Sequence, residues 1–391
     1  MNLDIINDKL PWRIQTMLGY RPKSVNFKHI TKVLTETKDN LPLNKVKLVS
    51  NGYDVKLKQP VSFLNDFRHH AFLENHVLPV EPVYFASIKN GRYCQYNLIP
   101  TILDSTNTII DGAQRHPFYY NPWKNDYHYP LLSCKKILKP RKIKGKVLSI
   151  ATDGGHDGYF HFIARIIPKL SVLEELNISL DEFTAIIING PETKYKLSAL
   201  SELGIPQEKV IFADDGMHIE AEYLFFVPRI RYHKMGLDYV REKFIDHNQQ
   251  VSSNNIYLSR KDALHRKLIG EEALEQKLQS EAGFTSSQFT GKSLSDQANT
   301  IYNADKILSL HGAGLTNVIF AKEGSTLIEI MDEAFVNVNF WFYANLVNVD
   351  YVSVIGESID TDYSISKKRP GYADIALSDD LQRKLIETVK S

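Results

Sequence analysis

Residues 306–310, Lys-Ile-Leu-Ser-Leu, run directly into the stretch His311-Gly312-Ala313-Gly314-Leu315-Thr316-Asn317. The apolar run is typical of a buried strand, and the stretch after it predicts a glycine-rich turn that opens a helix. Gly312 and Gly314 permit positive φ and let the backbone approach a ligand, while the first N–H groups of the helix favour an anion. This unit predicts a doubly wound α/β fold with a candidate diphosphate site at the turn.

Strand and helix signals alternate from residue 147 onward, in two series. Short apolar runs predict buried parallel strands at 147–151, 185–188, 210–212 and 223–227, and then at 256–258, 306–310, 326–330 and 351–354. Helical patterns lie between them at 159–176, 192–203, 270–281, 294–302 and 314–321. Pro168 should kink the first helix, and Ser293 with Asp296 forms a capping-box pattern. Two such series predict two Rossmann-like domains facing a cleft.

Four segments follow from these patterns. Residues 1–146 form a β-rich leading segment that ends in a basic linker and packs with the first domain. Residues 147–250 form the first Rossmann-like domain, on the acceptor side, and residues 251–377 form the second, which is expected to bind the nucleotide. The helix expected at 378–391 is amphipathic and could pack back on the first domain. The basic stretch at 135–146 is interpreted as a solvated linker, with contact to anionic lipid or a phosphorylated acceptor as the alternative.

The composition excludes several classes of protein. There are 47 Lys and Arg against 46 Asp and Glu, and 43% of the residues are hydrophobic, which argues against a nucleic-acid binder and against disorder. Cys94 and Cys134 are too few for a disulfide framework and lack metal-site spacing. Residues 1–20 show neither a secretory signal nor an anchor, so a cytoplasmic protein with at most peripheral membrane contact is expected. The oligomeric state is left open.

Charged residues near the glycine-rich turn extend the candidate site. Glu329 ends the next strand, where a carboxylate can bind ribose hydroxyls, and the loop after residues 256–258 carries Arg260 and Arg266, which can clamp phosphate oxygens. Two alternatives stay open: a tight structural turn with a capping Glu329, and a solvated loop in which Arg266 pairs with Glu271 or Glu272.

A second glycine-rich turn lies in the first series, and it reads Asp153-Gly154-Gly155-His156-Asp157-Gly158-Tyr159-Phe160-His161. His161 and Asp157 are the candidate general bases, because an imidazole or carboxylate can accept a proton at neutral pH. Asp153, His156 and Tyr159 are candidate acceptor contacts. The alternatives are a backbone-bonded His161 at a helix start and an N-cap role for Asp157, and the spacing matches no zinc signature.

Two further patterns carry little weight. Tyr239 and Lys243 have the Tyr-x-x-x-Lys spacing of short-chain oxidoreductases, but no glycine-rich dinucleotide turn opens the chain, so we interpret the spacing as coincidence. Aromatic residues between 118 and 129 could stack on sugar rings, although covering the core is the preferred interpretation.

The ordered motifs resemble glycosyltransferase family 61 over about residues 85–355. The motifs are Gly158-Tyr159-Phe160-His161, Pro168-Lys169-Leu170, Tyr257-Leu258-Ser259-Arg260, Ala263, Arg266, Gly283-Phe284, Ser293-Leu294-Ser295-Asp296-Gln297, the stretch at 311–317 and Leu327-Ile328-Glu329-Ile330. The family often has Asn where this chain has Gly158, and an Asn-Glu pair where it has Gly270-Glu271. Acceptor contacts could therefore differ.

The resemblance implies a GT-B fold, a nucleotide-sugar donor in the carboxyl-terminal half, inversion at the anomeric carbon and no essential metal. It places residues 311–317 and Arg260 beside the donor diphosphate, Glu329 near the ribose or sugar, and His161 at the cleft edge. Eukaryotic members carry a secretory signal or anchor, so this chain resembles the bacterial type, which acts on the cytoplasmic side of the membrane.

The leading hypothesis is an inverting hexosyl- or pentosyltransferase that uses a UDP-sugar as donor. Its acceptor would be a polysaccharide or glycolipid of the capsule or lipopolysaccharide type. No cofactor beyond the donor, no metal and no nucleic acid is expected. The alternatives are a nucleotide-dependent oxidoreductase or epimerase, and a non-catalytic glycan-binding subunit.

Overall fold

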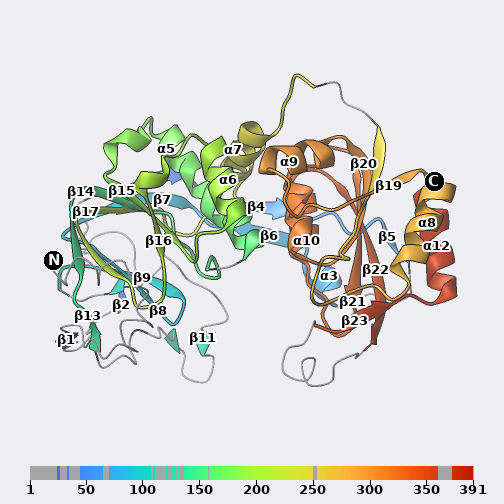
Figure 1. The fold of residues 1–391 in the computed structure, drawn as a ribbon, viewed down its shortest axis with the longest axis horizontal. Helices are drawn as coiled ribbons and strands as arrows, with labels where there is room; N and C mark the ends of the chain where they lie inside the picture. Colours follow the sequence, from blue (N-terminus) through green and yellow to red (C-terminus); the bar gives the residue numbers. More distant parts are fainter. Residues whose placement is uncertain are drawn as a thin grey trace, which may run out of the picture. The chain divides into compact units, whose positions relative to one another are not determined.

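The computed structural model describes residues 24–26, 33–34, 45–64, 70–106, 109–110, 120–121, 126–127, 131, 136–156, 158–249, 253–359 and 372–390. The chain forms two compact units (Figure 1). Unit 1 comprises Met1–Gly52 and Glu81–Tyr239, and unit 2 comprises Tyr53–Val80 and Val240–Ser391. Within the described ranges, no helix combines the length and the hydropathy needed to cross a membrane. The predicted aromatic cluster at 118–129 has no described side chains.

Unit 1 is built on a sheet whose parallel part has the order β16-β15-β14-β17. These strands are β14 (Arg141–Ser149), β15 (Ala185–Asn189), β16 (Val210–Ala213) and β17 (His218–Phe226). Every pairing among them is parallel. In chain order this is 3-2-1-4, so the strand order reverses between β14 and β17. Doubly wound sheets bind ligands at such a switch point, beyond the carboxyl ends of the strands.

Strands of the leading segment extend this sheet on the far side of β17. The pairs are antiparallel: β7 (Val83–Lys89) and β8 (Arg92–Tyr96) with β17, β3 (Lys45–Ser50) with β7, and β9 (Ile99–Leu103) with β8. Short strands at β10 (Ile109–Ile110) and β2 (Val33–Leu34) continue the order beyond β9. The sequence predicted a parallel strand at residues 223–227. The strand is confirmed as part of β17, which is parallel to β14 but antiparallel to β7 and β8.

The crossover after β14 is the helix predicted at 159–176, and it is broken. It consists of α4 (Tyr159–His161), the π-helical segment η3 (Phe162–Ile166), the 3₁₀ segment η4 (Ile167–Leu170) and α5 (Ser171–Glu175). The expected break at Pro168 is confirmed, because proline has no N–H to donate to the preceding turn. Helix α6 (Lys194–Glu202) follows β15, and α7 (Lys234–Phe244) carries the chain toward unit 2.

Unit 2 contains the second parallel series, in the order β19-β18-β20-β21-β22. The strands are β18 (Asn254–Leu258), β19 (Phe284–Ser287), β20 (Ala304–Leu310), β21 (Thr326–Asp332) and β22 (Asp350–Ile359), and their pairings are all parallel. The chain order is 2-1-3-4-5, so the switch point lies between β18 and β20. The predicted mixed α/β class is confirmed.

Helices cover both faces of this sheet (Figure 1). Helices α8 (Glu271–Ala282) and α12 (Asp379–Lys390) lie side by side on one face, and α9 (Leu294–Tyr302) and α10 (Asn339–Leu346) cover the other. The sequence suggested that the last helix could pack on the first domain. It packs on α8 instead, because Leu381 and Leu385 complete the apolar cluster formed by α8 and the sheet. The N-cap half of the predicted capping box is confirmed, since Ser293 Oγ accepts from Asp296 N at 3.0 Å.

Residues 53–80 belong to unit 2, whereas the sequence grouped them with the first domain. Strand β5 (Ser62–Phe63) pairs with β22, and β4 (Tyr53–Lys56) pairs with β6 (Val77–Val80). Phe72, in α3 (His70–Glu74), is fully buried, and its ring centroid lies 5.2 Å from Trp341 and 5.8 Å from Tyr351. Such aromatic packing is not visible in local sequence patterns.

Candidate functional site

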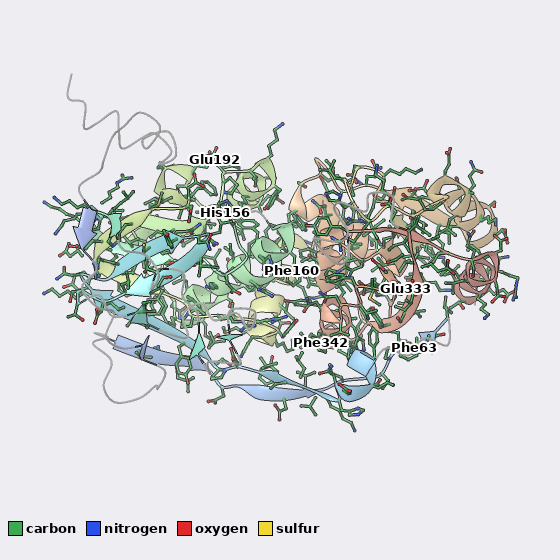
Figure 2. All side chains as sticks on the ribbon, turned by 90° about the horizontal axis from the view of Figure 1, so that it is seen from below. Phe63, His156, Phe160, Glu192, Glu333 and Phe342 are labelled. Atoms are coloured by element: carbon green, nitrogen blue, oxygen red, sulfur yellow. The ribbon has the colours of Figure 1, made fainter. Side chains whose placement is uncertain are left out.

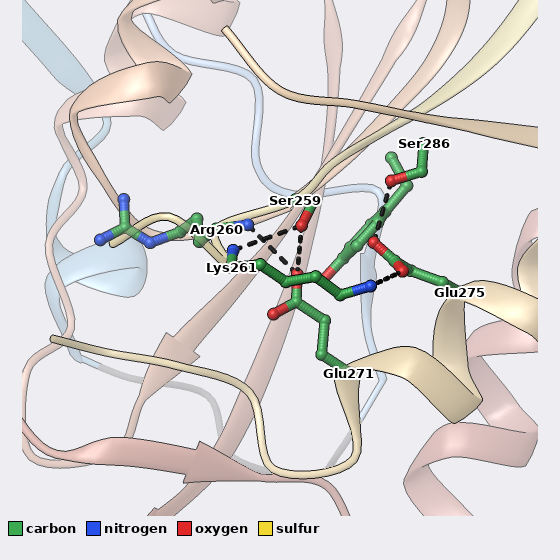
Figure 3. A network of polar contacts seen from close by, with 7 residues as sticks. Ser259, Arg260, Lys261, Glu271, Glu275 and Ser286 are labelled. Atoms are coloured by element: carbon green, nitrogen blue, oxygen red, sulfur yellow. Dashed lines mark hydrogen bonds and ion pairs between the residues drawn. The ribbon is translucent and has the colours of Figure 1, made fainter. Parts of the chain in front are cut away.

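Glu271 fixes the loop that leaves β18 (Figure 3). One carboxylate oxygen, Oε1, accepts from Tyr257 OH at 3.0 Å, Ser259 Oγ at 2.8 Å and the backbone N–H of Arg260 at 3.1 Å. Glu271 stands in the first turn of α8, where the helix dipole favours a negative charge. The Arg260 side chain points away from this network, and Lys261 pairs with Glu275. Glu271 therefore orients the loop, a role that the alternative pairing of Arg266 with Glu271 did not anticipate.

Arg260 lies directly over the glycine-rich turn of the neighbouring strand. A Cβ at Gly312 would stand 1.7 Å from Arg260 Nη1. Gly312 has a φ of 175°, which is extended, and Gly314 is not among the residues with positive φ. The prediction that these glycines supply positive φ is therefore wrong. Gly312 instead provides the space that the guanidinium occupies.

Two arginine side chains, Arg260 and Arg266, lie close together at the β18/β20 switch point. Burial lowers the pKa of Arg260 to about 10, and the positive charge of Arg266 acts in the same direction. Burial likewise lowers the pKa of Arg266. Within the part of the chain that the structure describes, neither Arg260 Nε nor Arg266 Nε has a hydrogen-bond partner. Two adjacent guanidinium groups with unused donors are suited to a phosphate-bearing ligand.

The glycine-rich stretch divides into an open half and a buried half. Ala313 is exposed and Gly314 is half-buried, whereas Leu315, Thr316 and Asn317 are buried. Thr316 Oγ1 donates to the carbonyl of Ala313 at 2.6 Å, and Asn317 Nδ2 donates to that of Gly314 at 3.0 Å. The prediction that residues 315–317 lie beside the diphosphate therefore needs correction. Their side chains hold the turn from inside.

His311 is oriented by a buried hydrogen-bond chain. Its Nδ1 lies 2.5 Å from Glu329 Oε1, and Glu329 Oε2 accepts from Tyr351 OH at 2.6 Å. Burial, and then the charge of Glu329, raise the pKa of Tyr351 well above its usual value, so the phenol stays a donor. Glu329 is fully buried. The predicted contact of Glu329 with ribose is therefore replaced by a positioning role, which leaves His311 Nε2 for a ligand.

The glycine-rich loop of unit 1 surrounds the His161 ring. A Cβ on Gly154 would lie 2.5 Å from His161 Cε1, and one on Gly158 would lie 2.7 Å from His161 Cδ2. Gly154 also has a φ of +68°, a conformation that favours glycine. These two glycines thus create the space for a half-buried imidazole. Asp157, the other candidate base, lies outside the described residues, and the N-cap of α4 is Gly158.

His156 (Figure 2) lies in this loop, and Tyr159 begins the helix that follows it. The carbonyl of His156 accepts from Lys196 Nζ at 3.0 Å, and its Nδ1 lies 3.5 Å from Gln95 Nε2. The Tyr159 ring packs edge-on against Tyr195, with centroids 5.5 Å apart. Both side chains are half-buried, so they stay candidates for acceptor contact.

Asp153 differs from these two residues because it is fully buried. Its Oδ2 lies 3.7 Å from Arg165 Nη1, and its charge acts on Lys169 and Arg229. The prediction that Asp153 contacts the acceptor is therefore revised, because the Asp153 carboxylate is buried inside a cluster of charged residues. This cluster could not be recognised in the sequence, because its members come from three separate segments.

Both candidate sites lie where a doubly wound sheet places ligands, so the comparison with known families bears on them directly. Residues 159–328 match the family model Glycosyltransferase 61. No curated protein matches the chain. The match supports a glycosyltransferase, with a sugar donor and a glycan acceptor. It contains His161, Arg260 and the stretch at 311–317, and it ends one residue before Glu329.

The cluster around Asp153 contains a buried lysine amine whose pKa lies far below its usual value. Lys169 Nζ donates to the carbonyl of Ala151 at 2.6 Å and is buried. Burial lowers its pKa from 10.5 to about 7, although Asp153 opposes this shift, and Arg229 reinforces it. At neutral pH, this amine is poised between its charged and uncharged forms.

We predict that this amine makes stability depend on pH. Between about pH 7 and 10 the unfolded chain holds the Lys169 proton while the folded protein releases it, so wild-type stability should rise with pH relative to a Lys169→Met variant. Below pH 7 both states are protonated, and the full cost of the buried charge is present. Thermal melts of both proteins between pH 6 and about 10 test this. Parallel Tm curves would contradict it.

Proposed function

We propose that the chain is an inverting glycosyltransferase that transfers a sugar from a nucleoside diphosphate donor, a UDP-sugar, to a glycan or glycolipid. The observation that carries the proposal is the Arg260 guanidinium lying over Gly312, beside Arg266, at the β18/β20 switch point. Two cationic forks suit the two phosphates of such a donor. The GT-B arrangement is part of the proposal, supported by the doubly wound strand order within each unit by itself.

The proposed reaction divides its work between the units. In unit 2, Arg260, Arg266 and His311 stabilise the charge that develops on the departing diphosphate. In unit 1, His161 removes the proton from the acceptor hydroxyl, which attacks the anomeric carbon from the opposite face. No step in this scheme draws on a metal ion. Asp157 stays the alternative base.

A thermal-shift screen tests the donor assignment. UDP, GDP, CMP and NAD are added to wild type, to Arg260→Gln and to Arg383→Gln, whose arginine forms only exposed ion pairs within α12. We expect UDP to raise the Tm of wild type and of Arg383→Gln, by an amount set by its concentration relative to Kd. Arg260→Gln should lose most of that shift. A stabilisation by NAD alone, or no response to any nucleotide, would count against the proposal.

Gly312→Ala offers a second test, with Gly314→Ala as the matched control. The new methyl group must displace the Arg260 guanidinium, while the extended φ of 175° causes no backbone strain. Loss of charge-assisted hydrogen bonds predicts about 10- to 100-fold weaker UDP binding. At Gly314 a Cβ meets nothing within 4 Å, so affinity should not change. If calorimetry gave equal UDP affinities for the two variants, Arg260 would not contribute to donor binding.

An oxidoreductase is the less favoured alternative. Burial raises the pKa of Tyr239 above its usual value, which is opposite to what a tyrosine acid–base catalyst near neutral pH needs. A role in capsule or lipopolysaccharide assembly, and a location at the cytoplasmic face of a membrane, extend the proposal and stay predictions. The proposed activity is that of a hexosyl- or pentosyltransferase, and a transfer assay with UDP-hexoses and UDP-pentoses distinguishes the two.

A further inference from the structure

A buried hydrogen-bond chain in unit 1 ends at the ring of His156. Tyr93 and Gln95 stand on β8 with one residue between them, so their side chains lie on the same face of the sheet. Both residues are fully buried. Tyr93 OH donates to Gln95 Oε1 at 2.5 Å, and Gln95 Nε2 lies 3.5 Å from His156 Nδ1. The chain therefore links a strand of the leading segment to the glycine-rich loop that encloses His161.

The phenol of Tyr93 sets the direction of this chain. Burial raises the pKa of Tyr93 well above its usual value, so the hydroxyl keeps its proton. Within the described part of unit 1, Tyr93 OH has Gln95 as its hydrogen-bond partner and no other. A buried hydroxyl that cannot donate is unfavourable, so the amide oxygen of Gln95 faces Tyr93 and the amide nitrogen faces His156. Because an amide nitrogen only donates, His156 Nδ1 accepts.

An accepting Nδ1 determines the tautomer of the neutral His156 ring. In a neutral imidazole one nitrogen carries the proton and the other offers a lone pair, and the hydrogen bond made by one nitrogen decides which is which. With the lone pair on Nδ1, the proton lies on Nε2. The ring then has no second lone pair with which to take a proton from a substrate. His156 is therefore a hydrogen-bond donor at Nε2 and is unsuited to act as a base.

The backbone of His156 is held independently of its ring. Lys196 is fully buried in α6, and its Nζ donates to the carbonyl of His156 at 3.0 Å and to that of Asn189 at 3.3 Å. Gly190 lies against the same His156 carbonyl, because a Cβ there would stand 1.5 Å from its oxygen. Asn189 Oδ1 accepts from Thr152 N at 2.9 Å, and Asn189 Nδ2 donates to the carbonyl of Thr152 at 2.7 Å. Such support fixes a side chain before a ligand binds.

We propose that Tyr93 and Gln95 are positioning residues that fix His156 as the Nε2-protonated tautomer, and that His156 binds the acceptor by donating from Nε2 to a saccharide oxygen. His156 thus orients the acceptor, while His161 of the same loop takes the proton of the attacking hydroxyl. The acceptor role rests on the proposed glycosyltransferase function, and the tautomer does not. Tyr93, Gln95 and His156 lie outside residues 159–328, so the family match does not assign this role to them.

The tautomer is tested by NMR on the full chain with ¹⁵N-labelled histidine rings. At about pH 8.5 histidine rings are neutral, and their protonated and unprotonated nitrogens give separate signals. The His156→Gln spectrum identifies the signals of this ring. We expect the wild type to carry the proton on Nε2. Gln95→Glu replaces the amide donor by a carboxylate, which accepts from the ring, so Nδ1 should become protonated.

Gln207→Glu is the matched control for Gln95→Glu, because it makes the same chemical change at an exposed position of unit 1 and should leave the His156 signals unchanged. If circular dichroism shows that Gln95→Glu is unfolded, Tyr93→Phe replaces it. That variant removes the hydroxyl that orients the amide, so a second tautomer should appear. A wild-type ring protonated on Nδ1, or identical His156 signals in the wild type and the folded variant, would overturn the tautomer assignment.

Transfer kinetics test the acceptor role. His156→Phe keeps an aromatic ring without an N–H, and it should lower kcat/KM for the acceptor by about tenfold or more, while UDP affinity stays at the wild-type value. His76→Phe alters an exposed histidine and serves as the control. An unchanged kcat/KM in folded His156→Phe would overturn the acceptor role. If UDP fails to bind the wild type while NMR shows the proton on Nε2, the glycosyltransferase proposal falls and the tautomer assignment stands.

Discussion

Replacing His161 by alanine is expected to lower kcat for sugar transfer by about 10²- to 10⁴-fold, the usual contribution of a general base. The physical reason is the position of the ring, which Gly154 and Gly158 enclose at distances that leave no room for a Cβ. Glycine at these two positions lets the loop enclose the imidazole, so the loop holds the His161 ring in one place. The KM for the donor should change little, because the donor site lies in unit 2.

Two comparisons make this result specific. His76→Ala removes an exposed histidine and should leave kcat unchanged. Gly158→Ala keeps the imidazole but pushes it away, since φ at this position is an ordinary −87° and the nearest obstruction is the ring at 2.7 Å, with the Gly154 carbonyl oxygen next at 3.3 Å. It should therefore lower kcat while thermal stability is largely retained. If transfer by His161→Ala stayed within about threefold of wild type, the base would have to be sought elsewhere, with Asp157 next in line.

The positions of most strands and helices could be predicted because local patterns determine them. The run at 306–310 lies inside β20, and Ser293 caps α9 through its own side chain. Short apolar runs between helical patterns are a reliable sign of parallel strands. The path of residues 53–80 could not be predicted, because Phe72 is placed by Trp341 and Tyr351, which lie far away in the sequence.

The residues of the candidate site could be predicted from the sequence, but the role of each residue could not. Arg260 and the glycine-rich turn were recognisable from their places after buried strands. Glu329 was identified too, but its role depends on Tyr351, one strand further along the sheet. Successive side chains of a strand point to opposite faces of the sheet, so Glu329 lies on the face opposite Ile328 and Ile330. Those two isoleucines pack against α8 and α12. That alternation was visible in the sequence, and it could have indicated that Glu329 points into the layer under α10.

Glu329→Gln is expected to lower kcat by about 10²- to 10³-fold, the cost of losing one oriented donor at a developing negative charge. The wild-type carboxylate accepts one hydrogen bond from His311 Nδ1 and one from Tyr351 OH. A glutamine amide can accept through its oxygen only, and its nitrogen must donate. If that nitrogen faces His311, the proton must move from Nδ1 to Nε2 or the ring must turn. If it faces Tyr351, the phenol must accept and its own O–H loses the acceptor that it has in the wild type.

The effect should appear in kcat rather than in donor binding, because Arg260 and Arg266 are untouched. Tyr351→Phe leaves Glu329 able to accept from His311 and should have a milder effect, whereas Glu333→Gln alters an exposed carboxylate (Figure 2) and serves as the control. Transfer kinetics, together with UDP calorimetry on each variant, separate the two contributions. A purely structural role for Glu329 would lower Tm and leave the kcat of the folded fraction at the wild-type value. An unchanged kcat in Glu329→Gln would therefore show that His311 takes no part in the reaction.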